Sequence, residues 1–171
     1  MIYIGIDNGV SGTVGAVGET RSELKSSVYF KTPTKRVLDY TKKEKWVNRI
    51  DFVSLLLILK NIKKEHDCRA FVERPMVNPM KFNASLSAVR ALETTLIVLE
   101  ELSISHEFMD SKEWQREMLP KLMDVDRSDR HSQLKKMSLS IGKRLFPNID
   151  FKGFEDADGL LIAEYCRKAK K

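Results

Sequence analysis

The sequence is poor in the residues from which several common kinds of functional site are built. It has only 2 cysteines and 3 histidines, and the cysteines, Cys68 and Cys166, lie far apart. This excludes a disulfide framework and leaves no Cys/His set for zinc, so we expect reduced thiols in a cytosolic protein. Glycine is also scarce, with 8 residues, which argues against the paired phosphate loops of an actin-like kinase.

Long apolar runs are missing as well. The densest apolar cluster, residues 52–59, is far shorter than the roughly 18 residues that a membrane span needs. The N-terminus has no basic segment ahead of a hydrophobic one, so we expect no signal peptide. We therefore predict no membrane partner and a cytoplasmic protein, located in the host cytoplasm if a phage encodes it.

The overall composition indicates a globular protein with a basic surface. Hydrophobic residues make up 42% and charged residues 32% of 171 positions, which suits a single domain over residues 1–171. Lys and Arg outnumber Asp and Glu by 30 to 24, giving a net charge of +6. This excess fits a polyanion such as nucleic acid, and a basic solvated surface explains it nearly as well.

The apolar pattern predicts an α/β fold. Three strands joined by short turns come first, and strands then alternate with helices, which predicts a mixed five-stranded sheet with helices on both faces. Residues 33–46 are polar and lysine-rich without a clear period, and we interpret them as a surface loop. The expected strands are residues 2–7, 13–17, 26–32, 69–73 and 104–109. The expected helices are residues 51–64, 84–102, 110–119, 134–145 and 155–168.

Acidic residues occupy the ends of two predicted strands and the start of the last predicted helix. Asp7 ends the first strand and Glu73 the fourth, and open α/β sheets build their sites at such carboxyl ends. Glu155 and Asp158 are three residues apart, so they share a helix face, while Asp156 points about 100° away from Glu155. Acids at a helix N-terminus also have a purely structural reason, because they complement the helix dipole.

Clustered carboxylates indicate hard-metal chemistry. Their oxygens repel one another unless cations are present, and they select Mg²⁺ or Mn²⁺ over Zn²⁺. Two such ions about 4 Å apart can cleave phosphodiesters. A basic protein around an acidic metal site has the charge layout that a nuclease needs, because Lys and Arg hold the phosphates.

Three motifs at these acids resemble those of one family. The segments GIDNG, AFVERP and DADGLLIAEY, in this order, are similar to those of RuvC-type Holliday-junction resolvases of the RNase H-like superfamily. The chain looks closest to the short members typical of phages. The resemblance implies an RNase H-like fold and a homodimer that binds four-way DNA junctions. Each subunit would nick one of two symmetric strands, leaving a 5′-phosphate and a 3′-hydroxyl, with Mg²⁺ or Mn²⁺.

The resemblance also implies which acids hold the metal. Asp7 matches the first-strand acid, Glu73 the second, and Asp158 the principal acid of the last helix. The fourth acid falls on Glu155, where the family usually has Asp or His, and Asp156 is the alternative. We prefer Glu155 because of helical phase. We expect Asp7 to bridge two Mg²⁺ ions and the other acids to complete their coordination.

Further residues match positions with DNA-binding roles in the family. An aromatic residue that stacks into the opened junction in bacterial members is replaced here by Met76, and Phe82 is either its substitute or a loop anchor. Lys112 matches a scissile-phosphate contact. His131 falls where another catalytic-side basic residue occurs, although polar surface explains a lone histidine too. Lys135 either tracks the DNA backbone or belongs to a solvated helix face.

Three other functions remain to be weighed. A broader RNase H-like nuclease would cut flaps, forks or replication intermediates. A non-enzymatic junction-binding protein would not need acids at all the expected positions. An actin-like kinase also opens with GID-x-G, but it needs a second domain. Cleavage mapping and ATP binding separate these possibilities.

Overall fold

A computed structural model of the chain describes residues 1–20, 27–40, 44–64, 66–120 and 129–169. Its strands are β1 (Ile2–Ile6), β2 (Thr13–Gly18), β3 (Val28–Lys31), β4 (Thr34–Leu38), β5 (Trp46–Ile50), β6 (Cys68–Glu73) and β7 (Ser105–Met109). Its helices are α2 (Phe52–Lys63), the 3₁₀ turn η1 (Pro79–Lys81), α3 (Phe82–Glu101), α4 (Ser111–Met118), α5 (Arg130–Leu145) and α6 (Asp158–Ala169).

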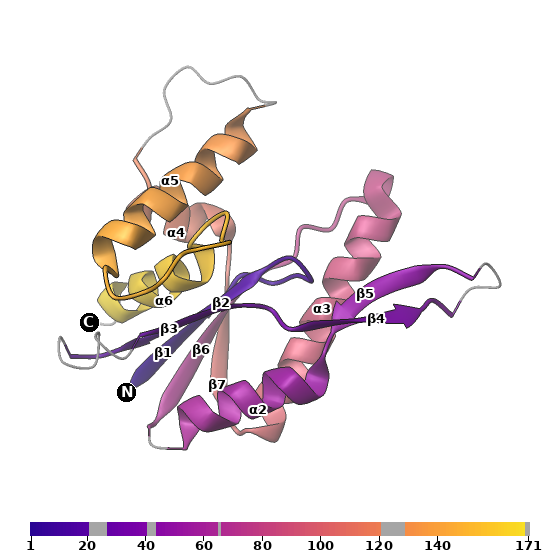
Figure 1. Cartoon of the computed structure of the whole chain (residues 1–171), viewed down its shortest axis with the longest axis horizontal. Coiled ribbons are helices and arrows are strands. Elements are labelled where there is room, and N and C mark those ends of the chain that lie inside the picture. The colour runs from indigo at the N-terminus through magenta and orange to yellow at the C-terminus, as the bar shows by residue number, and fades with distance from the viewer. Residues whose placement is uncertain (21–26, 41–43, 65, 121–128, 170–171) are drawn as a thin grey trace.

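The central sheet has five strands in the order β3-β2-β1-β6-β7. β1 pairs antiparallel with β2 and parallel with β6, so the sheet is mixed. Helices α2 and α3 cover one face, and α4, α5 and α6 cover the other (Figure 1). The predicted RNase H-like α/β architecture, with five strands and helices on both faces, is confirmed.

Strand β1 is buried on both faces and divides two hydrophobic cores. Ile2, Ile4 and Ile6 pack with α2 and α3, whereas Tyr3 faces the core under α6. In a strand, successive side chains point to opposite faces, so this alternation explains why the segment is apolar throughout. The strand is therefore packed on both sides up to its end at Ile6, directly before Asp7.

Helix α6 packs unusually closely on β1 and β2. A Cβ atom on Gly5 would lie 2.2 Å from the carbonyl oxygen of Gly159, and one on Gly15 would lie 2.5 Å from the backbone nitrogen of Leu160. These two strand residues must be glycine because the helix backbone occupies the space of a side chain. The contact places the N-terminus of α6 beside the end of β1.

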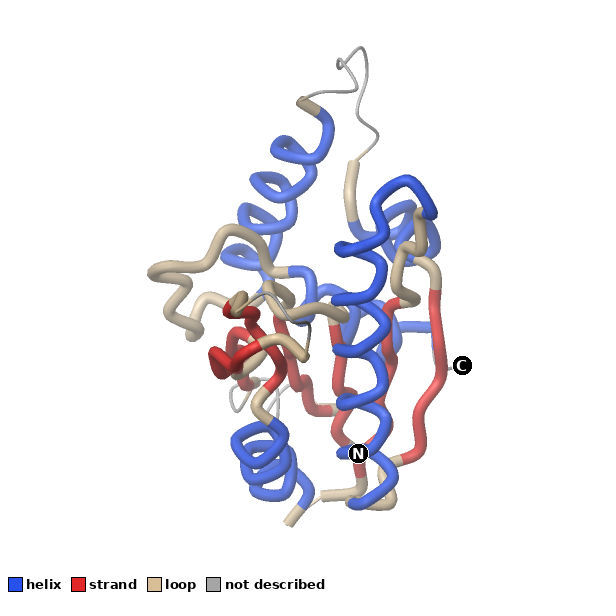
Figure 2. The backbone as a smooth tube through the Cα atoms, turned by 90° about the vertical axis from the view of Figure 1, so that its right-hand side faces the viewer, coloured by secondary structure: helices blue, strands red, loops and turns tan. Residues whose placement is uncertain are grey.

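Helix α3 runs along the sheet in front of the strands in the view of Figure 2. Together with η1 it forms the segment Pro79–Glu101, which by length and composition alone is apolar enough to cross a membrane. Its side chains Ala91, Val98 and Leu99 are buried in the core that also contains β1. One face of the helix is therefore packed in this core, as in an amphipathic helix that covers a sheet.

Two sequence-based boundaries were wrong. Residues 33–46, expected to be a loop, contain β4 and lead into β5, and these strands form a separate antiparallel hairpin. The last helix, expected from Glu155, begins at Asp158. There the backbone nitrogen of Asp158 donates to Oδ1 of Asp156 at 3.3 Å, and the first helical hydrogen bond runs from Leu161 to Ala157.

Candidate metal centre

Two acids lie at the same edge of the central sheet, where their strands end. β1 and β6 are parallel neighbours, and Ile6 pairs with Val72. The residues that follow, Asp7 and Glu73, therefore come to the same carboxyl edge. The backbone nitrogen of Asp7 donates to the carbonyl oxygen of Thr13 at 3.0 Å, which holds the start of the turn against β2. The prediction that strand ends would bring these two acids together is confirmed by the register.

The start of α6 adds two more acids to this edge. Asp7, Asp156 and Asp158 each offer a carboxylate oxygen, and these three atoms lie within 4.8 Å of one another. The side chain of Asp156 is only 5% exposed. Three carboxylate oxygens at this spacing form the donor set that hard divalent cations prefer.

Glu155, the preferred fourth acid, does not join this group. Its side chain is 80% exposed and pairs with Lys135 at 3.3 Å. Helical phase does not apply to Glu155, because this residue precedes the helix, which begins three residues later. Asp156, the alternative, takes the inward position instead, so the geometry reverses the order of preference between the two acids.

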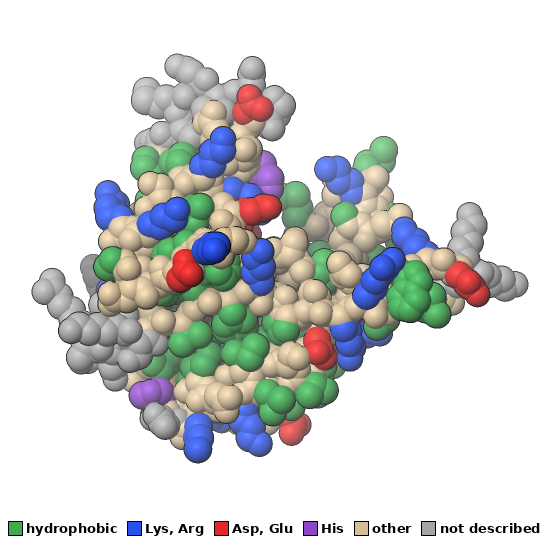
Figure 3. Space-filling model, in the orientation of Figure 1, with side chains coloured by type: hydrophobic (Ala, Val, Ile, Leu, Met, Phe, Trp, Pro, Cys, Tyr) green, Lys and Arg blue, Asp and Glu red, His purple; other side chains and the backbone are tan. Residues whose placement is uncertain are grey.

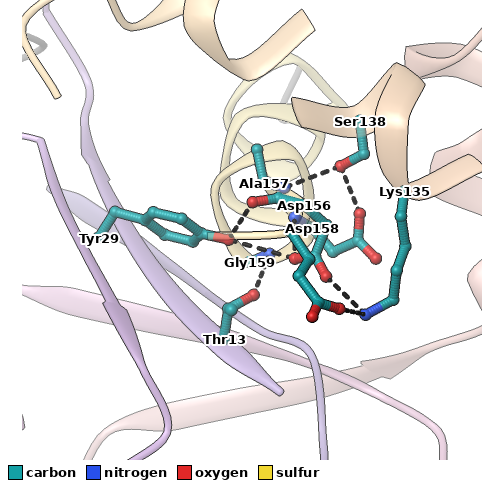
Figure 4. Close-up of polar contacts among 9 residues, drawn as sticks. Thr13, Tyr29, Lys135, Ser138, Asp156, Ala157, Asp158 and Gly159 are labelled. Atoms are coloured by element: carbon teal, nitrogen blue, oxygen red, sulfur yellow. Dashed lines mark hydrogen bonds and ion pairs between the residues drawn. The ribbon is translucent and has the colours of Figure 1, made fainter. Parts of the chain in front are cut away.

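A set of polar residues from other elements orients the acids of α6 (Figure 4). The hydroxyl of Ser138 on α5 donates to Oδ1 of Asp158 and accepts from the backbone nitrogen of Ala157 at 3.0 Å. Lys135, one turn earlier on α5, contacts Asp156 at 3.2 Å. The hydroxyl of Tyr29 donates to the carbonyl oxygen of Asp156 at 2.9 Å. The acids are thus fixed from both sides.

Glu73 has its own partner on α4. The indole nitrogen Nε1 of Trp114 donates to Oε2 of Glu73 at 3.0 Å, and the Trp114 ring is buried. A tryptophan indole can only donate, so this bond holds one carboxylate oxygen, and Ser111 at the start of α4 is a second hydrogen-bond partner of Glu73. The side chain of Glu73 is therefore oriented before any ligand arrives.

Burial and mutual repulsion raise the pKa values of the acids. The pKa of Asp7 lies well above its usual value because of burial, and then because of the charges of Glu73, Asp158 and Asp156. Burial and the charge of Asp156 raise the pKa of Asp158 to about 7. Burial also raises the pKa of Glu73, against the hydrogen bond from Trp114. Such shifts indicate a site where negative charge is poorly compensated within the described protein.

Three of these acids open into a cavity of about 600 Å³, whereas Asp156 lies behind its lining. Asp7, Glu73 and Asp158 line it together with four residues for which the sequence predicted DNA contacts, namely Met76, Lys112, His131 and Lys135. Phe82 is exposed at the start of α3 and does not line this cavity. Arg130, which the sequence reasoning did not single out, adds a further cation to the lining.

Sequence reasoning missed the supporting residues Tyr29, Trp114 and Ser138. Each belongs to an element distant in sequence from the acid that it holds. The helix containing Trp114 was predicted, but no local pattern indicates that its indole reaches Glu73. These partners follow only from tertiary packing.

No protein-family model and no curated protein matches the sequence. Solved structures do match. A structure of Thermus thermophilus RuvC in complex with a Holliday junction substrate has a TM-score of 0.63 at 14% identity, covering 99% of this chain and 96% of that chain. A second Thermus thermophilus RuvC structure has a TM-score of 0.53 at 12% identity, with the same coverage.

The chain has the fold of RuvC. At these identities the likeness concerns the fold, and the RuvC-like chain carries its acids at the sheet edge and helix start described above. The resemblance first seen in three short motifs therefore extends over the whole RuvC-like architecture.

Proposed function

We propose that this RuvC-like chain is a metal-dependent endodeoxyribonuclease that resolves four-way DNA junctions by paired symmetric nicks. The observation that carries the proposal is the convergence of Asp7, Asp156 and Asp158 within 4.8 Å at the edge of a RuvC-like sheet. The cations that line the same cavity support a polyanionic substrate. The junction specificity is taken from the solved relative, whose complex contains a Holliday junction substrate.

The donor set fits Mg²⁺ or Mn²⁺. All its side-chain ligands are carboxylates, and the described cavity offers them no Cys or His partner except His131. Lys135 lowers the pKa of Asp7, yet the net shift is upward, so the acids need more positive charge than this lysine supplies. Asp7, Glu73, Asp156 and Asp158 would hold the metal. When bound, the ion supplies Lewis acidity that offsets charge on the phosphate oxygens.

The surrounding residues act by orienting the acids and the DNA. Trp114 and Ser138 fix Glu73 and Asp158 through hydrogen bonds. Lys112 and His131 line the cavity where the scissile phosphate would lie, and we assign them phosphate contacts. Glu155 keeps Lys135 near Asp156 from outside the cluster.

Two exposed apolar residues suit an opened junction centre. Met76 is 82% exposed at the rim of the acidic cavity, three residues after Glu73. Phe82 is also exposed, at the start of α3. We propose that Met76 inserts between bases and that Phe82 assists from the neighbouring helix. Thioether and aromatic groups both pack on the faces of unstacked bases.

The proposed enzyme works as a homodimer in the cytoplasm. Paired nicks need two active sites, and α3 carries apolar residues on its outer face, including the exposed Val89 and Ile97. Light scattering of the free protein, and titration of a junction to two chains per DNA, test this assembly. Val89→Asp should weaken it without altering the acidic cluster.

The decisive assay is strand cleavage of fixed and mobile four-way junctions in Mg²⁺, Mn²⁺ or Ca²⁺, with both nicks mapped. We expect symmetric nicks with Mg²⁺ and Mn²⁺, and Asp7→Asn should abolish cleavage while leaving junction binding largely intact. Robust nicking by that variant in Mg²⁺ would rule out the assignment.

A broader nuclease acting on flaps, forks and replication intermediates is the second candidate. The feature that favours it is Met76, which stands where the resemblance implies a stacking aromatic; if Met76 does not replace that ring, the grip on an opened junction centre would be lost. Three-way junctions, flaps and linear duplexes in the same assay separate the two. Equal cleavage of flaps and four-way junctions would support the broader function.

A further inference from the structure

The β4–β5 hairpin stands apart from the central sheet as a two-stranded ribbon (Figure 1). Such a ribbon is marginally stable alone, so it needs support from the body of the protein. Buried Ile50 anchors its base, and Asp39 pairs with Arg90 of α3 at 3.7 Å. The hairpin is therefore an attached arm with most of its surface in solvent.

The arm carries an excess of positive charge. Four described residues of its strands and their ends are basic and three are acidic. Of these acids, Asp39 faces Arg90, and Asp51, directly after β5, pairs with Lys35 at 3.5 Å. Figure 3 shows Lys and Arg side chains spread along this arm. The basic residues are Lys35, Arg36, Lys45 and Arg49.

One face of the ribbon combines a cation with exposed apolar groups. Leu38 pairs with Trp46 and Arg36 with Asn48, so these four side chains share a face. The Arg36 guanidinium lies 5.3 Å from the centre of the Trp46 ring, and Leu38 and Trp46 are 54% and 52% exposed. Charge on a ribbon edge protects against aggregation, but that purpose does not account for an exposed tryptophan and leucine.

The opposite face borders a cleft that begins near the acidic cluster. This cleft, of about 310 Å³, lies between the hairpin and α3 and is lined by Lys45, Arg49 and Arg90. Val10, in the turn that follows Asp7, also lines it. The cleft thus extends from the turn beside the proposed metal centre out to the arm, where Lys45 and Arg49 line it and Asp39 offsets Arg90.

We propose that the β4–β5 hairpin grips a duplex arm of the DNA substrate through phosphate contacts from Arg36, Lys45 and Arg49. This inference rests on the proposed function for the identity of the substrate. A two-stranded ribbon fits the major groove of B-DNA, and spaced cations along it match the phosphate backbone. The contact is independent of sequence, because phosphates position a protein without reporting the bases.

The first test compares the DNA affinities of two triple variants that lose the same number of positive charges. Fluorescence anisotropy in Ca²⁺ measures their binding to linear duplexes and four-way junctions. Arg36→Gln/Lys45→Gln/Arg49→Gln removes the arm's cations, and Lys60→Gln/Lys64→Gln/Lys143→Gln removes three exposed cations elsewhere as the matched control. We expect the arm variant to bind about tenfold or more weakly, with a salt slope smaller by about 1 to 3. Its defect should shrink when the junction arms are shortened. Equal affinities and slopes for the two variants would overturn the proposal, as would a defect confined to self-association.

A second test needs no substitution. Trp114 is buried and Trp46 is exposed, so acrylamide quenching of the wild-type fluorescence reports mainly on Trp46. Linear duplex DNA in Ca²⁺ should reduce the quenching, and unchanged quenching at saturating DNA would contradict the contact. Wild-type protein that protects Trp46 but never nicks junctions would refute the proposed function and leave the arm contact standing. Junction cleavage without protection of Trp46 would support the proposed function and refute the arm contact.

Discussion

The carboxylates of Asp7 and Asp158 lie within 4.8 Å of each other, although the two residues come from opposite ends of the chain. The glycines under α6 make this approach possible. Gly5→Ala would place a Cβ 2.2 Å from the Gly159 carbonyl oxygen, which is backbone and can yield only if the helix shifts. We expect a loss of about 1–3 kcal/mol in the free energy of unfolding and weaker Mn²⁺ binding.

Gly9→Ala is the matched control for this substitution. A Cβ there would meet its nearest neighbour at 3.8 Å, an ordinary contact. Urea denaturation and Mn²⁺ titration of both variants test the role of the close packing. If Gly5→Ala keeps the wild-type free energy of unfolding, the position of α6 does not depend on the absence of a side chain at Gly5.

The raised pKa of Asp158 predicts how the metal-free protein responds to pH. Its pKa rises from 3.8 to about 7 on folding, so the folded state holds the proton more tightly than the unfolded state. The contribution of this group to stability is therefore greatest at low pH and is lost as pH rises from about 4 to about 7, by up to about 1.4 kcal/mol per pH unit. The raised pKa values of Asp7 and Glu73 act in the same direction.

Urea denaturation in EDTA across this pH range measures the effect. Asp158→Asn should flatten the decline and be more stable than the wild type at pH 8 without metal. Mg²⁺ at pH 8 should stabilise the wild type more than the variant. If the stability of the wild type instead rises with pH through this window, the pKa values of these acids are not raised in the folded protein.

Asp156 and Glu155 can be separated by paired substitutions. Asp156 is buried beside Asp7 and Asp158, whereas Glu155 is exposed and contacts only Lys135 in the described hydrogen-bond and ion-pair network. Asp156→Asn should lower junction cleavage by more than the roughly 10–100-fold typical of losing an outer-sphere partner, and Glu155→Gln should stay within that range. Single-turnover rates in Mg²⁺ decide the matter. The opposite ranking would restore the assignment based on the family pattern.

Ser138 offers a test of how the acids are positioned. Its hydroxyl donates to Asp158 and accepts from the backbone of Ala157, and it is completely buried. Ser138→Ala should weaken Mn²⁺ binding about 10–100-fold, while Ser140→Ala, at an exposed position of the same helix, should leave it unchanged. Calorimetric titration with Mn²⁺ provides the readout. Identical affinities would mean that Asp158 is held by the helix backbone alone.

The sequence was sufficient for those parts of the fold that buried apolar residues encode. Strands such as β1 and β6 are apolar and end in acids, so both their type and their functional ends were predictable. The hairpin was missed because its strands are largely exposed and rich in Lys and Arg, without the alternation that marks a half-buried strand.

The candidate site was predictable only where a residue's role follows from a strand end. Glu155 was preferred because the last helix was predicted to begin three residues before its observed start. Residues outside a helix do not follow its periodicity. The contacts of Trp114 with Glu73 and of Tyr29 with Asp156 join distant segments. They depend on tertiary packing, which local sequence patterns do not encode.

The most direct test of the central claim is the anomalous scattering of Mn²⁺ in crystals of the wild-type protein above pH 7. The account predicts a peak bounded by the carboxylates of Asp7, Asp156 and Asp158, on the side facing Glu73, and its loss in Asp7→Asn. A well-ordered Mn²⁺ ion bound elsewhere, with no peak at these carboxylates, would contradict the account.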